Sequence, residues 1–366
     1  MALIEKVRKN NLEKSEKEKI FKNIDLYLEQ NFKDKIVKYL DLGAKIVKLE
    51  CYSKEFMPHV EKQLTYVLKD SASSYDATLK VWKEPNSDLF PTKVFDELNP
   101  KNNLQLRVKI LTKQIERIDS AVFDYELSKV KPIFQNKSSK NAKTVEAINK
   151  DTNTYYYGIE NLESEELIKE GHLFVQNLNE ILKTPTSNLV HGASIGVDNH
   201  GILFCARGQR GKSTLAVLSM FKGFEYVSDD YLTIEKKNNK LYSSPIYSII
   251  TLSPKMYNEL YDYLDGTKFV SNNARKDKYV VNISKFHNQF KKNYPIDICM
   301  FPEIMDIKEP FIVPCEKSRA IVQLIHSTLM QTRDLADTKT VKKIYEMVKD
   351  FDFYKTVNYT YIAAVS

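Results

Sequence analysis

Residues 189 to 234 read LVHGASIGVDNHGILFCARGQRGKSTLAVLSMFKGFEYVSDDYLTI, and this stretch decides the fold that we expect. The chain of 366 residues contains only ten glycines, and six of them lie between Gly192 and Gly223. Glycine is needed where the backbone takes a positive φ or comes too close to another group for a Cβ atom. The crowding of glycines therefore indicates a backbone that is built around a ligand.

The centre of this stretch matches a phosphate-binding loop. Residues 206 to 213 read ARGQRGKS and follow the P-loop pattern GxxxxGK[S/T], except that alanine replaces the first glycine. The preceding residues predict a β-hairpin, GASIGV and GILFCA joined by the turn DNHG, and the following residues predict a helix from about Ser213 to Lys222 that Gly223 ends. A loop between a strand and a helix N-terminus presents backbone N–H groups and partial positive charge to phosphates.

We expect the loop to bind a nucleotide through nine residues, which are Ala206, Arg207, Gly208, Gln209, Arg210, Gly211, Lys212, Ser213 and Thr214. Lys212 would reach the β- and γ-phosphates, and the Ser213 hydroxyl would join a Mg²⁺ shell, with Thr214 as the weaker choice. Arg207 and Arg210 add positive charge, although either one can face solvent instead.

Two adjacent carboxylates follow one helix and one strand later, in FEYVSDDYLTI. Asp229 and Asp230 would point in opposite directions in an extended segment, so that they can serve two functions. One can help to hold Mg²⁺, and the other can accept the proton of an attacking hydroxyl as a general base. The sequence leaves open which is which, and also whether one of them only caps a turn.

Further basic residues follow in the segment ARKDKY. Arg275 and Lys278 could neutralise charge on a transferred phosphoryl group, but a solvated loop explains them equally well.

The segments VHGASIGV, GILFCARGQRGKSTLAVL and GFEYVSDDYLTI together resemble the catalytic domain of the HPr kinase/phosphorylase family and its HPr-kinase-like relatives. The resemblance is specific over about residues 186 to 235, looser to about 350 and weak before 186. It implies an α/β P-loop kinase domain of the HPr kinase/phosphoenolpyruvate carboxykinase-like type over residues 186–366. An α+β domain, residues 1–185, would precede it and serve acceptor recognition or assembly.

The resemblance also implies transfer of the γ-phosphoryl group of ATP to a serine hydroxyl, with Mg²⁺. Lys212 and Ser213 match the loop lysine and hydroxyl of the family, and Asp229 and Asp230 match its acidic pair. His191 matches a histidine near the phosphates, although on sequence alone it could equally be a core residue at the end of a strand. The glycine-rich signature that follows the acidic pair in true HPr kinase/phosphorylases is absent, so we expect a serine kinase that is not HPr kinase proper. The acceptor could be a peptide, a protein or a small molecule; a non-catalytic ATP sensor and an ATPase are the alternatives.

Composition and charge narrow the function classes. The net charge of +7 comes from 55 basic and 48 acidic residues, a balance that does not favour a nucleic-acid-binding protein. The N-terminus has no apolar segment typical of a signal peptide, no apolar run approaches about 20 residues, and the four cysteines form no CxxC pair. We expect a cytoplasmic protein that binds neither nucleic acid nor membrane; homo-oligomer formation stays open.

The first half of the chain carries weaker patterns, which alternate between helix and strand. They predict helices over residues 1 to about 40 and 58–69, strands over 44–53, 77–84, 155–159 and 172–177, and a loop over 135–154.

Overall fold

The computed structural model describes residues 14–83, 123–124, 129–133, 144–159, 162, 172–206, 210–264, 269–270, 279–305, 309–332 and 338–359. It shows a mixed α/β protein whose chain divides into two compact units. Unit 1 is formed by Met1–Leu40, Ile46–Glu61 and Leu68–Asn177, and unit 2 by Asp41–Lys45, Lys62–Val67 and Leu178–Ser366.

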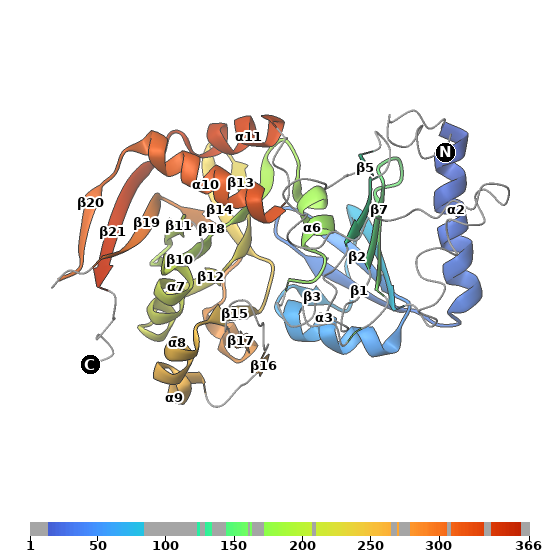
Figure 1. The fold of residues 1–366 in the computed structure, drawn as a ribbon, viewed down its shortest axis with the longest axis horizontal. Coiled ribbons are helices and arrows are strands. Elements are labelled where there is room, and N and C mark those ends of the chain that lie inside the picture. The colour runs from blue at the N-terminus through green and yellow to red at the C-terminus, as the bar shows by residue number, and fades with distance from the viewer. Residues whose placement is uncertain are drawn as a thin grey trace. The chain divides into compact units, whose positions relative to one another are not determined.

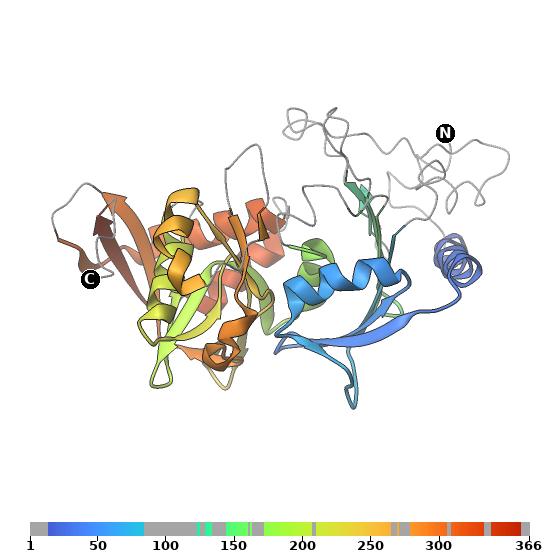
Figure 2. The same ribbon diagram turned by 90° about the horizontal axis from the view of Figure 1, so that it is seen from below.

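Unit 1 is built on an eight-stranded sheet with the order β3-β1-β2-β4-β8-β7-β6-β5. Strands β2, β4 and β8 are parallel, whereas β5 to β8 follow one another antiparallel. The strands are β1 (Ile36–Asp41), β2 (Ile46–Cys51), β3 (Leu68–Lys69), β4 (Ala77–Lys83), β5 (Phe123–Asp124), β6 (Lys129–Ile133), β7 (Thr144–Asn149) and β8 (Thr154–Ile159). The helices are α2 (Lys14–Asn31) and α3 (Met57–Leu64), which follows the 3₁₀ turn η1 (Lys54–Phe56), and α6 (Val175–Leu182) begins where the unit ends. Helix α3 lies along one face of the sheet (Figure 2).

The sequence predictions for unit 1 were partly wrong. The helix predicted to about residue 40 ends at Asn31, and Ile36–Asp41 forms β1, which pairs with β3. The predicted loop over 135–154 contains β7, and the helix predicted over 58–69 ends at Leu64. Strand β1 pairs with β3, about 30 residues further along the chain, and local periodicity carries no information about such a partner. Strand β7 pairs with the next strand, β8, in a hairpin within a polar segment.

The strand predicted over 172–177 was also wrong, because α6 begins at Val175. Phe174, Leu178 and Leu182 are fully buried and lie four residues apart, which is the spacing of one helix face. A short apolar run fits both templates, so that only its continuation distinguishes a helix from a strand.

Unit 2 contains three sheets, which have the orders β12-β10-β11-β19-β21-β20, β18-β14-β13-β9 and β15-β17-β16. The strands are β9 (Ser187–His191), β10 (Ala193–Val197), β11 (His200–Phe204), β12 (Glu225–Ser228), β13 (Tyr231–Lys237), β14 (Lys240–Pro245), β15 (Ile249–Leu252), β16 (Phe269–Val270), β17 (Tyr279–Asn282), β18 (Tyr294–Ile296), β19 (Ile298–Met305), β20 (Phe311–Pro314) and β21 (Asp352–Tyr359). The helices are α7 (Lys212–Phe221), α8 (Pro254–Glu259), α9 (Tyr261–Leu264), α10 (Lys317–Thr332) and α11 (Thr338–Val348), with the 3₁₀ turn η3 at Ser284–Gln289.

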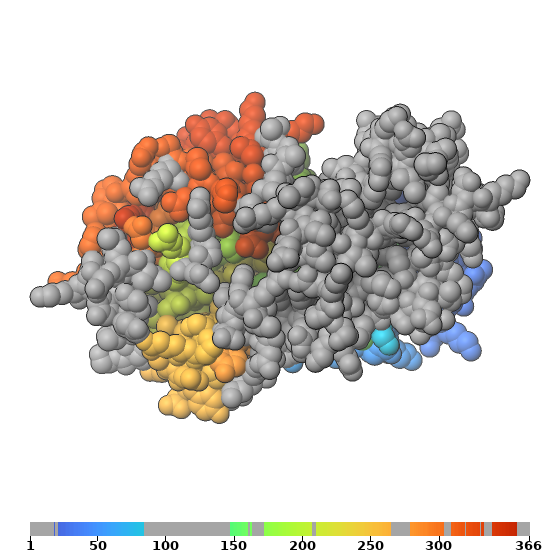
Figure 3. Space-filling model, viewed as in Figure 1, coloured from blue at the N-terminus to red at the C-terminus, as the bar shows by residue number. Residues whose placement is uncertain are grey.

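The six-stranded sheet of unit 2 is covered on both faces, so that its central strands are apolar at consecutive positions. Leu203 packs into the core beneath α10 and α11, while its neighbour Phe204 packs into the core beneath α7. Cys299 and Met300 of β19 alternate in the same way. Figure 1 shows α10 and α11 on one side of these strands and α7 and α8 on the other, and the same helices follow one another down the visible face of unit 2 in Figure 3.

The elements that were predicted around the loop are confirmed. Strands β10 and β11 form an antiparallel hairpin, whose turn residues Asp198 and Asn199 have φ of 50° and 64°. Helix α7 ends in a Schellman motif, in which Gly223 has φ of 91° and donates its N–H to Met220 O while Phe224 donates to Ser219 O. Within the described part of the chain, no helix is both long enough and apolar enough to cross a bilayer.

Substitutions at two glycines of unit 2, Gly201 and Gly223, test this packing. A Cβ atom on Gly201 would lie 1.9 Å from the backbone oxygen of Pro295, which has little freedom to move because Gly201 and Asp297 are joined by two hydrogen bonds. We predict that Gly201→Ala lowers the free energy of unfolding by about 3 kcal/mol through overpacking. Gly223→Ala meets no atom within 4 Å and should lose only about 1 kcal/mol, from the positive φ. Urea unfolding of the two variants measures the difference, and equal losses would contradict the packing described.

Candidate functional site

The candidate site begins where β11 ends and α7 starts. The chain continues from Phe204 through Cys205 and Ala206, and the description resumes at Arg210. Gly211 precedes α7 in the left-handed conformation, with φ of 88° and ψ of 7°, which any residue with a Cβ adopts at a cost of about 1–2 kcal/mol. Helix α7 follows this glycine directly, and its first N–H groups have no partner within the helix, as an anion site at a helix N-terminus requires.

Lys212 lies across the base of this loop. Its side chain is almost fully buried, and its Nζ donates a hydrogen bond of 2.9 Å to the carbonyl oxygen of Ala206. Burying an ammonium group is costly, because a carbonyl replaces only part of the hydration that the charge loses. The protein therefore holds a buried positive charge at the start of α7.

The acidic pair lies at the same edge of the sheet. Strands β11 and β12 are both antiparallel to β10, so they run in the same direction and their carboxyl ends meet at one edge. Asp229 and Asp230 follow β12 directly, and Asp230 has a positive φ of 61°. Ligands of open α/β sheets commonly bind at this edge, where the strands end.

Asp229 is the more buried of the two carboxylates, with 2% of the residue exposed. Neither of its oxygens receives a hydrogen bond of normal geometry from the described residues. Burial, together with the charge of Asp230, raises the pKa of Asp229 to about 7, while the Ser213 hydroxyl, the Lys212 charge and the backbone N–H of Asp230 lower it. Lys212 and Asp229 are buried, and Ser213 between the loop and the acidic pair is half-buried.

Asp230 is held by two neighbours. Thr251 Oγ1 donates a hydrogen bond of 2.8 Å to one carboxylate oxygen, and His191 Nε2 lies 3.6 Å from the other. The side chain of Asp230 is 17% exposed, so it is more accessible than Asp229.

His191 connects the acidic pair to the loop through Ser327 of α10. His191 Nδ1 lies 2.6 Å from Ser327 Oγ, and this oxygen lies 3.2 Å from the carbonyl oxygen of Ala206, which also accepts from Lys212. Because a serine has a single hydroxyl proton, Ser327 donates either to Ala206 or to His191. If it donates to Ala206, His191 must donate its Nδ1–H to Ser327. A hydrogen bond from Nε2 to Asp230 then requires a second proton on the ring.

The structure thus brings together most of the predicted site residues that it describes. Lys212 contacts Ala206, and His191 lies beside Asp230. Both Ser213 and Lys212 lower the pKa of Asp229. Thr214 lies half-buried in the first turn of α7, and Arg210 is exposed. The remaining predicted residues lie outside the described residues, and these are Arg207, Gly208, Gln209, Arg275 and Lys278.

Sequence reasoning missed three hydroxyl groups of the site. Ser327 and Thr328 lie in α10, where the Thr328 hydroxyl accepts from the backbone N–H of His191, and Thr251 lies at β15. Each interrupts an apolar run at a buried position. That interruption is the signal that could have marked them, because a buried hydroxyl needs a partner.

Comparisons with known proteins leave the family open. No family model matches the chain, and no curated protein matches it. Among solved structures, the HPr(Ser) kinase/phosphatase from Coxiella burnetii is similar over 49% of this chain and 82% of its own, with 10% sequence identity and a TM-score of 0.25. At this TM-score the likeness does not establish a shared fold.

The raised pKa of Asp229 predicts how stability depends on pH without nucleotide or divalent cation. Between about pH 4 and pH 7 the folded chain keeps a proton that the unfolded chain releases, so the free energy of unfolding falls as pH rises and levels off above pH 7. Asp229→Asn removes this fall. Relative to the wild type, the variant should gain about 3 kcal/mol between pH 5 and pH 8 in urea unfolding with EDTA present. Parallel pH curves for the two proteins would show that Asp229 is not held in this environment.

Proposed function

We propose that this chain is an ATP- and Mg²⁺-dependent kinase that transfers the γ-phosphoryl group to a serine-type hydroxyl of a peptide, protein or small molecule. One observation carries the proposal: a chain of contacts joins Lys212 of the loop to the acidic pair. The carbonyl oxygen of Ala206 accepts from Lys212 Nζ and lies 3.2 Å from Ser327 Oγ. Ser327 Oγ lies 2.6 Å from His191 Nδ1, and His191 Nε2 lies 3.6 Å from Asp230. A loop lysine and an acidic pair in one buried site are what phosphoryl transfer requires. In this account residues 186–366 form the kinase domain, and residues 1–185 recognise the acceptor or serve assembly.

The residues present fit a magnesium ion. The Ser213 hydroxyl and the carboxylates of Asp229 and Asp230 are hard oxygen ligands, and the two oxygens of Asp229 are buried without a hydrogen-bond partner among the described residues. The described residues contain no group of three or more His, Cys, Asp or Glu side chains placed to hold a metal. Mg²⁺ does not need one, since it is usually bound by one or two carboxylates, substrate phosphates and water. When bound, it would neutralise charge on the β- and γ-phosphates.

The loop and α7 supply the positive field for the phosphates. The N–H groups that begin α7 and the buried ammonium of Lys212 are fixed before the nucleotide arrives, so little reorganisation is needed during transfer. We propose that Lys212 exchanges its bond to Ala206 O for the phosphate oxygens.

Asp230 is suited to receive the proton of the acceptor. It is more accessible than Asp229, and Thr251 and His191 fix its two oxygens. As the acceptor oxygen forms its bond to the γ-phosphorus, its proton passes to Asp230, and the bond between this phosphorus and the β–γ bridging oxygen breaks to release ADP. Asp229, which lies beside Ser213, would then help to hold the metal ion.

Loss of the Lys212 charge tests the proposal. The protein is incubated with Mg²⁺ and γ-labelled ATP, and offered free L-serine and a degenerate library of serine-containing peptides. We predict labelled acceptor with the wild type, and a loss of about 100-fold or more in the rate with Lys212→Ala, because the charge that stabilises the transferring phosphoryl group is gone. Lys222→Ala is the matched control, since Lys222 is exposed at the other end of α7.

Three outcomes separate the kinase from its alternatives. Label transfer that survives in Lys212→Ala contradicts the proposal. Release of labelled phosphate without any acceptor, or without labelling of the acceptors that are offered, indicates an ATPase. A sensor is indicated by two results together. The wild type neither transfers nor hydrolyses the phosphate, and the variant with both aspartates replaced by asparagine still binds ATP.

A further inference from the structure

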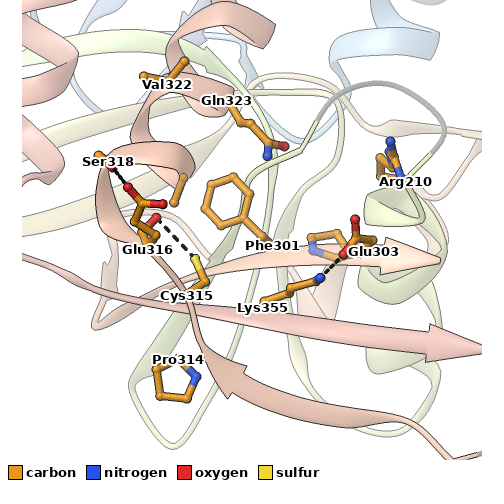
Figure 4. A pocket seen from close by; sticks show the side chains of 12 residues that line it. Arg210, Phe301, Glu303, Pro314, Cys315, Glu316, Ser318, Val322, Gln323 and Lys355 are labelled. Carbon is orange, nitrogen blue, oxygen red and sulfur yellow. Dashed lines mark hydrogen bonds and ion pairs between the residues drawn. The ribbon is translucent and has the colours of Figure 1, made fainter. Parts of the chain in front are cut away.

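A cavity of about 700 Å³ opens beside the loop in unit 2. It lies over the middle of β19 and β21, where these strands run on beyond the end of β11, and is bordered by the first turns of α10 and by Arg210 of the loop (Figure 4). Its volume falls within the roughly 300–1,000 Å³ typical of small-molecule sites. None of the groups described for the phosphate site except Arg210 borders it.

The cavity and the acidic pair flank the loop on opposite sides. In the sheet, β12 lies two strands from β11 on one side, and β19 and β21 follow β11 on the other. Phe204 of β11 pairs in register with Met300 of β19, so Phe301 in the cavity wall lies one residue beyond the level at which β11 ends. Phosphates held in the loop would therefore have the carboxylates on one flank and the cavity on the other.

The proposed transfer reaction, on which this inference rests, fixes the direction in which the nucleotide lies. The attacking and leaving oxygens lie roughly in line on opposite sides of the transferred phosphorus. Asp230 receives the acceptor proton on the β12 side, so the leaving diphosphate extends toward β19 and β21. The rest of the nucleotide must then lie where the cavity is.

The geometry points to the cavity as the binding site for the nucleoside, that is the base and ribose, of the nucleotide whose phosphates the loop holds.

The walls have the chemistry that a nucleoside requires. Phe301 and Val322 offer apolar surface for the flat face of a base. Gln323 extends from α10 toward the space between Phe301 and Arg210, and its amide can both donate to and accept from a base edge (Figure 4). Glu316, whose carboxylate accepts from Ser318, can accept from ribose hydroxyls.

The charges in the cavity oppose the reverse orientation. Lys355 forms an ion pair with Glu303 and so neutralises one of the two carboxylates in the cavity wall. Lys355 does not pair with the other carboxylate, Glu316. A carboxylate repels phosphates, whereas Arg210 attracts them at the loop end of the cavity. The uncharged end of the nucleotide therefore fits the interior, and the phosphates fit the loop.

The test compares two ligands that share phosphates but differ in the nucleoside. Isothermal titration calorimetry measures the dissociation constants of ATP and inorganic tripolyphosphate, both with Mg²⁺. Val322→Trp places a bulky side chain at the rim from a residue that is 63% exposed, and Gln323→Ala removes the base-reading amide without adding bulk. Both variants should weaken ATP binding about tenfold and leave tripolyphosphate binding unchanged. Tyr345→Trp, at an exposed position of α11, is the control for the added surface tryptophan and should change neither.

The outcomes separate this inference from the proposed function. Unchanged ATP affinity in both cavity variants, or equal weakening of both ligands, overturns the nucleoside site. Lys212→Ala should weaken both ligands, and if it weakens neither, the phosphate site itself is wrong. A rise in the KM of the acceptor with unchanged ATP affinity would place the acceptor in the cavity instead.

Discussion

A buried carboxylate that receives no hydrogen bond of normal geometry from the described residues is the constraint on which the site depends. Asp229 is held beside Lys212 and Ser213, where burial raises its pKa to about 7. Leaving a carboxyl group in this state reduces stability, and Lys212, whose charge is also buried, adds to the cost. Such locally unfavourable groups are typical of functional sites, because a ligand supplies the partners that the fold omits.

The sheet of unit 2 brings these groups to one edge. Strands β11, β12, β19 and β21 all point the same way, and only β10 and β20 run against them. The loop and the acidic pair therefore share the edge at which β11 and β12 end, and the cavity lies beside them over β19 and β21. Helix α10 joins them, because its first turns border the cavity and Ser327, further along it, contacts both Ala206 and His191.

The sequence predicted the parts of the site whose signals are local. A hairpin turn, a glycine-rich loop and a C-terminal glycine cap are each encoded within a few residues, and the structure contains the hairpin, α7 and the Gly223 cap as expected. The contacts of Ser327 and Thr251 were not predictable in this way, because they join residues 136 and 21 positions apart. The helix predicted over the residues of β1 was wrong for the same reason, because β1 pairs with β3 about 30 residues further on. The strand predicted over 172–177 was wrong because a short apolar run fits both templates, and its continuation into α6 distinguishes them.

A crystal structure with Mg²⁺ and a non-hydrolysable ATP analogue tests the central claim most directly. The account predicts that the triphosphate occupies the loop before α7, with Lys212 Nζ within hydrogen-bond distance of a β- or γ-phosphate oxygen. The metal should lie between the γ-phosphate, Ser213 and a carboxylate of the acidic pair. A nucleotide bound elsewhere, or a γ-phosphate that neither Lys212 nor the acidic pair can reach, would contradict the account.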